Sequence, residues 1–251
     1  MKPAHDADHY SYALYADPGM AESFDAKRFG GPIGELLLET QDRVLREFLG
    51  TIAGRRVIDV GTGTGRAALT LARGGADVVG IDASAEMLRV ARTRADAERL
   101  EIDFREGDAH GLAFPDRSFD AAVSFRVLMH TPGWRQCLGE LCRVARDRVI
   151  VDYPAACSAA LLQSIGRRIL ARLGRRTEPY RVFTARGIRR TLEANGFRIA
   201  AVHRQFVLPI ALHKDVGSRA FTEGLEAGLD AAGLLALLGS PVTVLAERCR
   251  S

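Results

Sequence analysis

The chain has 251 residues, 47% hydrophobic and 26% charged, so it is long and apolar enough to bury a substantial core. Its 35 Lys and Arg residues against 31 Asp and Glu residues give a net charge of +4, too mild to indicate nucleic-acid binding by itself. No apolar leader opens the chain and no run of about 18 apolar residues occurs, which argues against secretion and against a membrane-spanning helix. Its 4 cysteines lack a paired C-x-x-C spacing and indicate reduced thiols. We therefore expect a single-domain, cytoplasmic protein.

The first half of the chain alternates between strand-like and helix-like patterns. Residues 1–30 are polar and bear tyrosines, and residues 34–49 have the apolar periodicity of a helix. The strands expected next are 56–60, 77–82, 102–106, 121–125 and 148–152, and the helices expected between them are 66–73, 85–97 and 134–144. Strands that are apolar on both faces belong in a parallel sheet covered by helices on both sides, which predicts an α/β fold.

The strict alternation breaks after residue 152. The elements expected there are a helix over 156–173, a loop over 174–181, a helix from 184 to 195, a strand over 197–206, a helical excursion over 207–240 and a last strand over 241–246. The last strand fits antiparallel beside the sixth. This predicts a seven-stranded, mostly parallel sheet in a single domain. Its core covers about 50–155 and 184–248, and its helical lid elements are 1–48, 155–183 and 207–240.

A glycine-rich turn follows the first strand, and a carboxylate ends the second. The turn has the pattern D-x-G-x-G-x-G, in Asp59, Gly61, Gly63 and Gly65. Glycines let the backbone approach a ligand, and the acid after the second strand, Asp82, can accept hydrogen bonds from ribose hydroxyls. The dinucleotide fingerprint G-x-G-x-x-G is not met, because Arg66 stands where its third glycine belongs. An acid at the end of the first strand also repels a pyrophosphate, and it suits a cofactor that carries an amino group and a sulfonium.

At this point the chain resembles the class I S-adenosylmethionine (SAM)-dependent methyltransferases, whose first motif is D/E-x-G-x-G-x-G. Three later segments match motifs of small-molecule members in the same order, namely 107–109 (GDA), 114–123 (FPDRSFDAAV) and 138–144 (LGELCRV). The overall layout looks like that of the methyltransferases of ubiquinone and menaquinone biosynthesis. The likeness is clear over residues 50–155 and weaker over 184–206. It implies a Rossmann-like fold, SAM as cofactor and S-adenosylhomocysteine (SAH) as product.

The resemblance also implies roles for the loop residues. The backbone at Gly61 and Gly63 lies along the methionine moiety, and Asp59 stands near the ammonium group, with a water between them. Asp82 accepts hydrogen bonds from both ribose hydroxyls. The alternative interpretation of both acids is a helix cap or a solvated loop acid. Thr62, Gly65 and Phe125 complete this part of the expected cofactor site.

The adenine side of the expected site follows the second and third strands. By the same resemblance, Asp108 accepts a hydrogen bond from the adenine N6 amino group, and the Ala109 backbone N–H donates to the ring. Ala83 and Met87 are placed to contact the apolar surface of the adenine or ribose, although Met87 is equally consistent with the core. Arg28, from the N-terminal segment, can reach the cofactor carboxylate or lie at the surface.

Methyl transfer needs little from the protein beyond alignment and the exclusion of water, since a sulfonium is already an activated donor. A general base is required only when the acceptor is a hydroxyl or a carbon acid. His130 is the best candidate base. The alternative is that His130 starts a helix, where it bonds the backbone or packs under Trp134. Tyr153 is the second candidate for the catalytic set. We expect Asp152 and Tyr153 to face the same side of the sheet, where either can contact substrate.

The parts outside the common core are expected to cover the acceptor. Tyr10, Tyr12, Tyr15 and Phe24 can close over the cofactor. The arginines between 167 and 181 have two interpretations. They form a solvated helix face, or they attract an anionic acceptor, RNA or an acidic membrane surface. The apolar stretch 206–212 can line an acceptor pocket or belong to the core. These features favour a small lipophilic or aromatic acceptor.

Several functions are disfavoured by what is missing. Residues 124–127 contain no proline pair of the amino-methylase kind, and the sequence near Cys157 does not match a Pro-Cys nucleophile motif, so a buried thiol is expected. No metal site is predicted, and the run His5, Asp6, Asp8 and His9 lies in a tail. The alternatives that remain are an RNA methyltransferase, a nicotinamide oxidoreductase and a non-catalytic SAM-binding domain. Nucleic acid is not an expected partner, peripheral membrane contact is compatible with the sequence, and either a monomer or a homodimer is expected.

Overall fold

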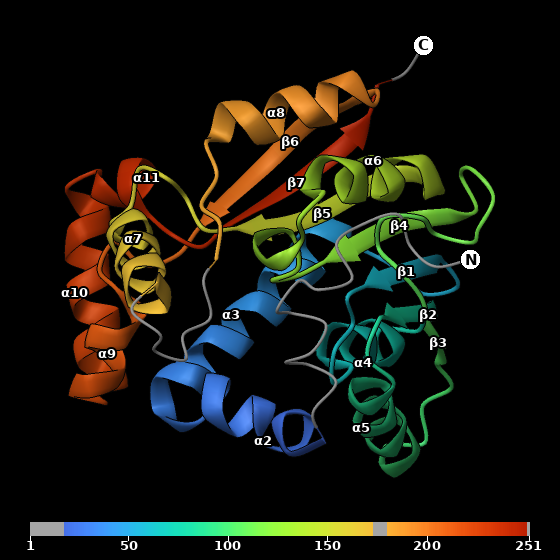
Figure 1. Cartoon of the computed structure of the whole chain (residues 1–251), viewed down its shortest axis with the longest axis horizontal. Coiled ribbons are helices and arrows are strands. Elements are labelled where there is room, and N and C mark those ends of the chain that lie inside the picture. Colours follow the sequence, from blue (N-terminus) through green and yellow to red (C-terminus); the bar gives the residue numbers. More distant parts are fainter. Residues whose placement is uncertain (1–17, 173–179, 250–251) are drawn as a thin grey trace.

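A computed structural model of the chain describes residues 18–172 and 180–249 (Figure 1). At its centre is a seven-stranded sheet with the strand order β3-β2-β1-β4-β5-β7-β6. The strands are β1 (Arg56–Val60), β2 (Asp77–Asp82), β3 (Asp103–Glu106), β4 (Phe119–Ser124), β5 (Ala145–Tyr153), β6 (Phe197–Arg204) and β7 (Val242–Arg248). The first five pair in parallel, and β7 pairs antiparallel with both β5 and β6. The predicted Rossmann-like α/β fold with a mostly parallel sheet is confirmed.

Helices cover both faces of this sheet (Figure 1). On one face lie α3 (Gly31–Leu49), α4 (Arg66–Arg73) and α5 (Ala85–Ala97), and on the other α6 (Trp134–Val144) and α8 (Ala185–Ala194). Side-chain caps begin two of these helices. The Ser84 hydroxyl accepts a hydrogen bond from the Met87 N–H at the start of α5, and the Thr184 hydroxyl accepts one from Gly187 at the start of α8.

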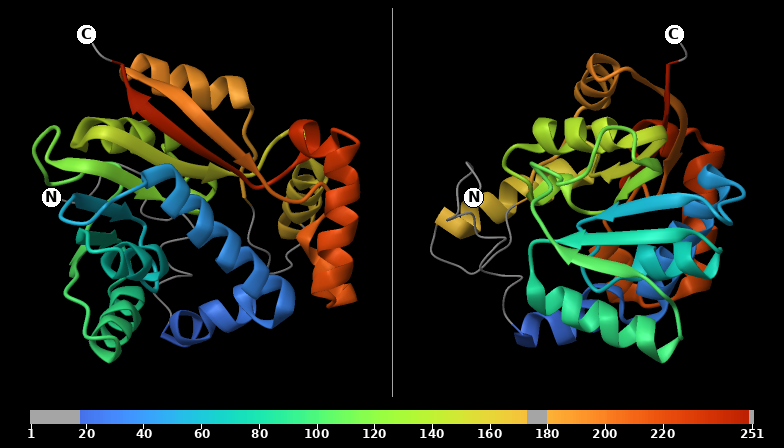
Figure 2. Two further views of the ribbon diagram at one scale, coloured as in Figure 1. Left: turned by 180° about the vertical axis from the view of Figure 1, so that it is seen from behind. Right: turned by 90° about the vertical axis from the view of Figure 1, so that its right-hand side faces the viewer.

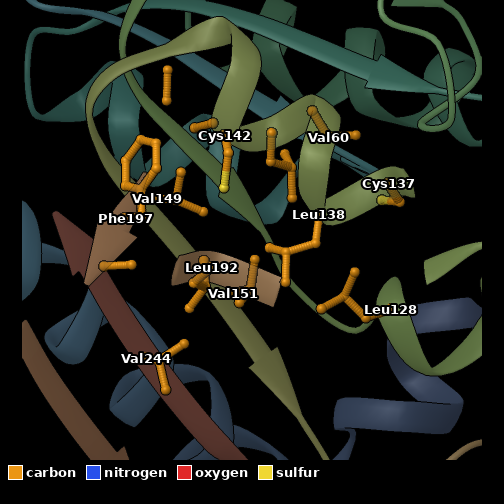
Figure 3. Packing of buried hydrophobic residues seen from close by; sticks show 14 of the residues in the cluster. Val60, Leu128, Cys137, Leu138, Cys142, Val149, Val151, Leu192, Phe197 and Val244 are labelled. Carbon is orange, nitrogen blue, oxygen red and sulfur yellow. The ribbon is translucent and has the colours of Figure 1, made fainter. Parts of the chain in front are cut away.

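The core forms because the central strands are apolar on both faces. Ile58 of β1 packs into the cluster beneath α6 and α8, and its neighbour Val57 packs into the cluster beneath α3, α4 and α5. Figure 3 shows the first cluster, in which Leu138 of α6, Leu192 of α8 and β-strand valines interlock. Burial on both sides stabilises the sheet and fixes the positions of the loops at its carboxyl edge.

The last strand lies inside the sheet. The prediction that it is antiparallel to the sixth strand is confirmed, but β7 also pairs with β5 and separates it from β6. Hence Asp152 of β5 lies opposite Thr243 of β7, and Thr243 lies opposite His203 of β6. Cross-strand neighbours in register point to the same face, so these three side chains form one row across the sheet.

The remaining helices gather beyond the carboxyl ends of the parallel strands (Figure 1). They are α2 (Pro18–Phe29), α7 (Ala159–Arg172), α9 (Ile210–Val216), α10 (Arg219–Ala231) and α11 (Leu234–Leu238). The expected helical excursion over 207–240 therefore consists of α9, α10 and α11, seen again from behind in Figure 2. Phe29, Leu37 and Phe206 form a small separate core that joins α2, α3 and the loop after β6. None of the described helices is both long and apolar enough to span a membrane.

Candidate active site

A cavity of about 200 Å³ opens at the carboxyl ends of the parallel strands, beneath α2. Most of the predicted site residues line it, namely Arg28, Gly61, Thr62, Gly63, Asp82, Ala83, Met87, Asp108, Ala109, Phe125 and His130. Three predicted residues do not belong to its lining, namely Asp59, Gly65 and Tyr153. The loops after four different strands thus meet at one concave site, as expected for a ligand pocket of an open α/β sheet.

The glycine loop is held by backbone hydrogen bonds and by close packing. The N–H groups of Gly61 and Thr62 both donate to the carbonyl of Ile81, at 2.7 and 2.9 Å. Gly61 has a φ of 72°, and a Cβ there would lie 2.1 Å from the side chain of Val127. Glycine is required at this position, both for the left-handed backbone and for the approach of the loop that follows β4.

Asp82 is both a member of the cavity lining and a link to the glycine loop. Its Oδ2 accepts a hydrogen bond from the Gly63 N–H at 2.8 Å, and its Oδ1 accepts one from the Ser84 N–H at 2.9 Å. Burial raises the pKa of Asp82, while these backbone donors oppose that rise. A carboxylate has about four lone-pair sites, so acceptor capacity remains for hydroxyl donors in the cavity.

Asp59 lies behind the loop. Its carboxylate is 2% exposed, accepts a hydrogen bond from the Thr62 hydroxyl at 2.7 Å and lies against the first turn of α4. Burial raises the pKa of Asp59 from 3.8 to about 6. The residue therefore positions Thr62, which does line the cavity, and its predicted proximity to an ammonium group stays a prediction.

The adenine side of the predicted site is organised around Asp108. The Oδ1 atom of Asp108 accepts hydrogen bonds from the His110 backbone N–H at 2.9 Å and from Nδ1 of the same imidazole, 2.7 Å away. His110 is 4% exposed and also lines the cavity. Sequence reasoning missed this histidine. The available signal was an acid two residues before it, a spacing at which Asp side chains often bond the local backbone.

Helix α2 covers the cavity and is tied to the loop beneath it. Phe24 and Arg28 line the cavity, and their side chains stack at 5.0 Å. The carboxylate of Asp25 accepts from the Thr64 hydroxyl at 3.1 Å and pairs with Arg94 of α5. Sequence reasoning missed Asp25, because its partners lie about 40 and 70 residues away in the chain. The tyrosines predicted to help close the site lie outside the described residues.

The segment after β4 separates this cavity from a smaller hollow on its other side. Phe125 and Arg126 line both spaces. The other residues of the hollow are Phe29, Leu37, Thr40, Gln41, Val44, Asp152, His203, Gln205, Pro241 and Thr243. The Arg126 N–H donates a hydrogen bond to the Asp152 carboxylate. Arg126 has a φ of 61°, which is uncommon for a residue other than glycine. The Arg126 side chain is half-buried, and its guanidinium lies 5.8 Å from the centre of the Phe29 ring.

Polar groups in this hollow are partly desolvated. Burial raises the pKa of Asp152 and lowers the pKa of His203. Among the described residues, Nε2 of His203 is a buried side-chain nitrogen without a hydrogen-bond partner. A hydroxyl or an amine that entered the hollow would find an acceptor there.

Two sequence-based expectations near the end of β5 are wrong. Asp152 and Tyr153 face opposite sides of the sheet, because successive residues of a strand alternate. The Tyr153 ring is 2% exposed and packs edge-on against Phe183 in the core under α6, so the structure does not bring it to the cavity. Cys157 is exposed rather than buried. Its thiol donates to the Leu237 carbonyl.

Other expected features have a structural role or lie outside the described residues. Gly65, at a φ of 83°, is the N-cap residue just before α4, and a Cβ there would be 3.0 Å from Ala91 of α5. His130 is half-buried in the 3₁₀ turn η1 (Leu128–His130) and lines the cavity. The polar run His5 to His9 and much of the arginine-rich stretch before residue 180 are not described.

Sequence comparison relates part of this chain to known proteins. A family model described as "Methyltransferase domain" matches residues 57–148, which run from β1 into β5. Demethylmenaquinone methyltransferase of Thermus thermophilus is 40% identical over 107 residues, covering 41% of this chain and 49% of that protein. Residues 57–148 are therefore a methyltransferase domain. The methyltransferase of the same name from Deinococcus radiodurans is 36% identical over 128 residues, 48% of this chain and 53% of that one. The chain thus spans about half the length of these curated relatives.

Solved structures support the same fold for the methyltransferase domain and its surroundings. Magnesium protoporphyrin IX methyltransferase from Synechocystis PCC 6803, solved with bound SAH, superposes with a TM-score of 0.69 at 19% identity. The superposition covers 97% of this chain and 100% of that chain. The cyclase SpnF also shares the fold, with a TM-score of 0.58 at 23% identity over 84% of this chain and 81% of its own. Likeness at this level shows the fold alone, since one fold supports several reactions.

Proposed function

We propose that the protein binds SAM in the main cavity and transfers its methyl group to a small lipophilic or aromatic acceptor. The observation that carries this proposal is the position of two carboxylates in the cavity. Asp82 stands after β2, oriented by Gly63 and Ser84, and Asp108 stands after β3, oriented by His110. A ribose with two hydroxyls fits the first carboxylate, and an amino group on a purine fits the second.

The charge of the cavity favours SAM over a dinucleotide. Asp59 is buried and Asp82 is half-buried at the glycine loop, and desolvation raises the pKa of each. A buried carboxylate is stabilised by a cation and destabilised by a phosphate. SAM brings an ammonium and a sulfonium to this position, whereas NAD would bring a pyrophosphate. The proposal therefore places the ammonium group on the Asp59 side of the loop, with Thr62 between them.

We assign the acceptor to the part of the main cavity next to Phe125 and Arg126, which separate it from the smaller hollow. The hollow combines apolar side chains such as Leu37 and Val44 with polar groups such as Asp152 and His203. The hollow, at about 30 Å³, has room for a hydroxyl but not for a ring, so the ring of the acceptor lies in the main cavity and its hydroxyl points toward the hollow. The names of the relatives, which refer to a demethylmenaquinone and a porphyrin, point to ring-shaped acceptors as well.

His130 is the residue proposed to take up a proton. It lines the cavity at the η1 turn, after the loop that carries Phe125 and Arg126. An acceptor hydroxyl loses its proton when its oxygen takes the methyl group, so a nearby imidazole speeds the transfer. The rest of the acceleration comes from holding the acceptor in line with the methyl group and from excluding water under α2.

The first experiment is calorimetric titration of the purified protein with SAH, with NADH and NADPH in parallel. The Asp82→Ala variant should bind SAH at least tenfold more weakly, because it loses a carboxylate that holds both the ribose and the loop. The matched control is Glu106→Ala. Glu106 of β3 lies beside Asp82 of β2 in the strand register, but it is exposed and outside the cavity. Binding of a nicotinamide cofactor in preference to SAH would refute the proposal.

A second experiment separates an enzyme from a domain that only binds SAM. Incubation with SAM and a panel of hydroxylated arenes, quinols and porphyrins is followed by mass spectrometry of SAH and of methylated product. Turnover with at least one of these acceptors, reduced in His130→Ala without loss of SAH binding, is expected. If SAH binds tightly but no acceptor in the panel is methylated, the assigned acceptor class is wrong.

A further inference from the structure

His110 connects two loops that line opposite parts of the cavity. On one side its Nδ1 atom lies 2.7 Å from Oδ1 of Asp108. On the other side its Nε2 atom accepts a hydrogen bond from the backbone N–H of Gly133, at 3.3 Å. Its own carbonyl accepts from the Gln136 side chain at 2.7 Å. His110 is 4% exposed, and these partners fix its ring from several directions.

The two contacts determine where the imidazole carries its proton. A backbone N–H can only donate, so Nε2 must be the unprotonated nitrogen toward Gly133. A neutral imidazole has one N–H, which then resides on Nδ1 and is donated to Asp108. The loop after β4 therefore sets the tautomer of His110. This tautomer directs the Nδ1–H hydrogen bond to Asp108.

Asp108 is consequently oriented as a hydrogen-bond acceptor for the cavity. Both hydrogens from His110, the backbone N–H and the Nδ1–H, go to the same oxygen, Oδ1. They fix the rotation of the carboxylate and leave Oδ2 to a donor in the cavity that Asp108 lines. Such an oxygen can accept a hydrogen bond but cannot donate one. It therefore binds the 6-amino group of adenine and repels the 6-carbonyl oxygen of hypoxanthine.

We infer that His110 is a specificity-determining residue, which makes the site select adenine over hypoxanthine by holding Asp108 in this orientation. This inference rests on the proposed function, because it takes the cavity to be the place where the SAM nucleoside binds. It assigns to His110 a positioning role through Asp108. A site built around a hydrogen bond rejects a ligand that cannot make it, because a buried polar group is then left unpaired.

Two substitutions separate the two contacts of the ring. In His110→Asn the amide nitrogen takes the place of Nδ1 and can still donate to Asp108, but nothing reaches Gly133. In His110→Gln the longer amide oxygen takes the place of Nε2 and can still accept from Gly133, but the donor to Asp108 is lost. His110→Ala removes both contacts.

The measurement is the ratio of the dissociation constants of inosine and adenosine, by calorimetry, with SAH titrated in parallel. Wild type should prefer adenosine at least tenfold. His110→Asn should keep most of this preference, and His110→Gln and His110→Ala should lose at least fivefold of it. Asp108→Asn, whose amide can also donate, should move the ratio toward inosine. The control is His213→Asn, since His213 is a buried histidine bonded to Thr222 and Glu226, away from the cavity.

A merely structural histidine would weaken both nucleosides by the same factor. An unchanged ratio in His110→Gln and His110→Ala, with SAH bound by the wild type, would overturn this inference and leave the proposed function intact. A wild type that binds neither SAH nor adenosine would overturn the proposed function, and this inference with it. Circular dichroism and the melting temperature of each variant confirm that the compared proteins are folded.

Discussion

Asp59 gives the apo protein a pH dependence of stability that a single substitution can remove. Its carboxylate is buried, and burial raises its pKa from 3.8 to about 6. Between these pH values the unfolded chain releases the proton while the folded chain retains it. Stability therefore falls as the pH rises from about 4 to about 6, and the loss stays constant at higher pH. Asp59→Asn, which cannot ionise, escapes this loss.

The size of the effect follows from the two pKa values. Their difference corresponds to about 3 kcal/mol, at about 1.4 kcal/mol for each pH unit. For a chain of this length, each kcal/mol moves the melting temperature by roughly 2–4 °C. The melting temperature of Asp59→Asn minus that of wild type should therefore rise by roughly 6–12 °C between pH 4 and pH 6 and then level off. The assay is thermal unfolding by circular dichroism in matched buffers, without cofactor.

Only the pH dependence of this difference is diagnostic. The amide keeps an acceptor for Thr62, and any constant gain or loss from the replacement shifts all pH values alike. Asp77→Asn is the control, because Asp77 is an exposed acid at the start of β2 and its curve should run parallel to wild type. Parallel curves for Asp59→Asn as well would show that the carboxyl titrates as it does in the unfolded chain. With SAH present, the proposed ammonium contact should reduce the difference at pH 7.

Three further substitutions test the loops around the site. Gly61→Ala should lower the melting temperature and weaken SAH binding, because the new Cβ would lie 2.1 Å from the Val127 side chain. Adding Val127→Ala should restore part of the loss. If nothing is restored, the positive φ of the backbone alone causes the loss. Arg126→Gly should be about 1 kcal/mol more stable than Arg126→Ala in urea unfolding, because only glycine relieves the positive φ, and equal stabilities would contradict this. Glu226→Ala should lose about 1–3 kcal/mol in the same assay, because two backbone N–H groups of the loop after β6 lose their acceptor. Glu223→Ala, one turn away and exposed, should be near neutral, and equal losses at both positions would refute the assignment.

Local signals in the sequence predict most of the elements that build the site. The helices predicted over 66–73 and 85–97 have the same bounds as α4 and α5. These successes share a cause, since helix ends and buried strands are specified by a few adjacent residues. The cofactor loops could be placed because parallel strands bring their carboxyl ends together at one edge of the sheet.

The failures come from contacts that join distant parts of the chain. The insertion of β7 between β5 and β6 depends on strand pairing that no local pattern encodes. The bond from Gly133 to His110 spans 23 residues, and the bond from Thr64 to Asp25 spans 39. Tyr153 is different, because the alternation of side chains along a strand was sufficient to separate it from Asp152.

The position of β7 also affects the order in which the sheet can form during synthesis. β5 ends at residue 153, but its partner β7 ends at residue 248, so 95 residues of chain are made in between. At about 5–20 residues per second, the outer edge of β5 stays without its partner for roughly 5–20 s. An unpaired strand edge is a template for pairing with another chain. The charged residues Arg146, Asp147 and Arg148 at the start of β5 give the nascent chain protection against such pairing.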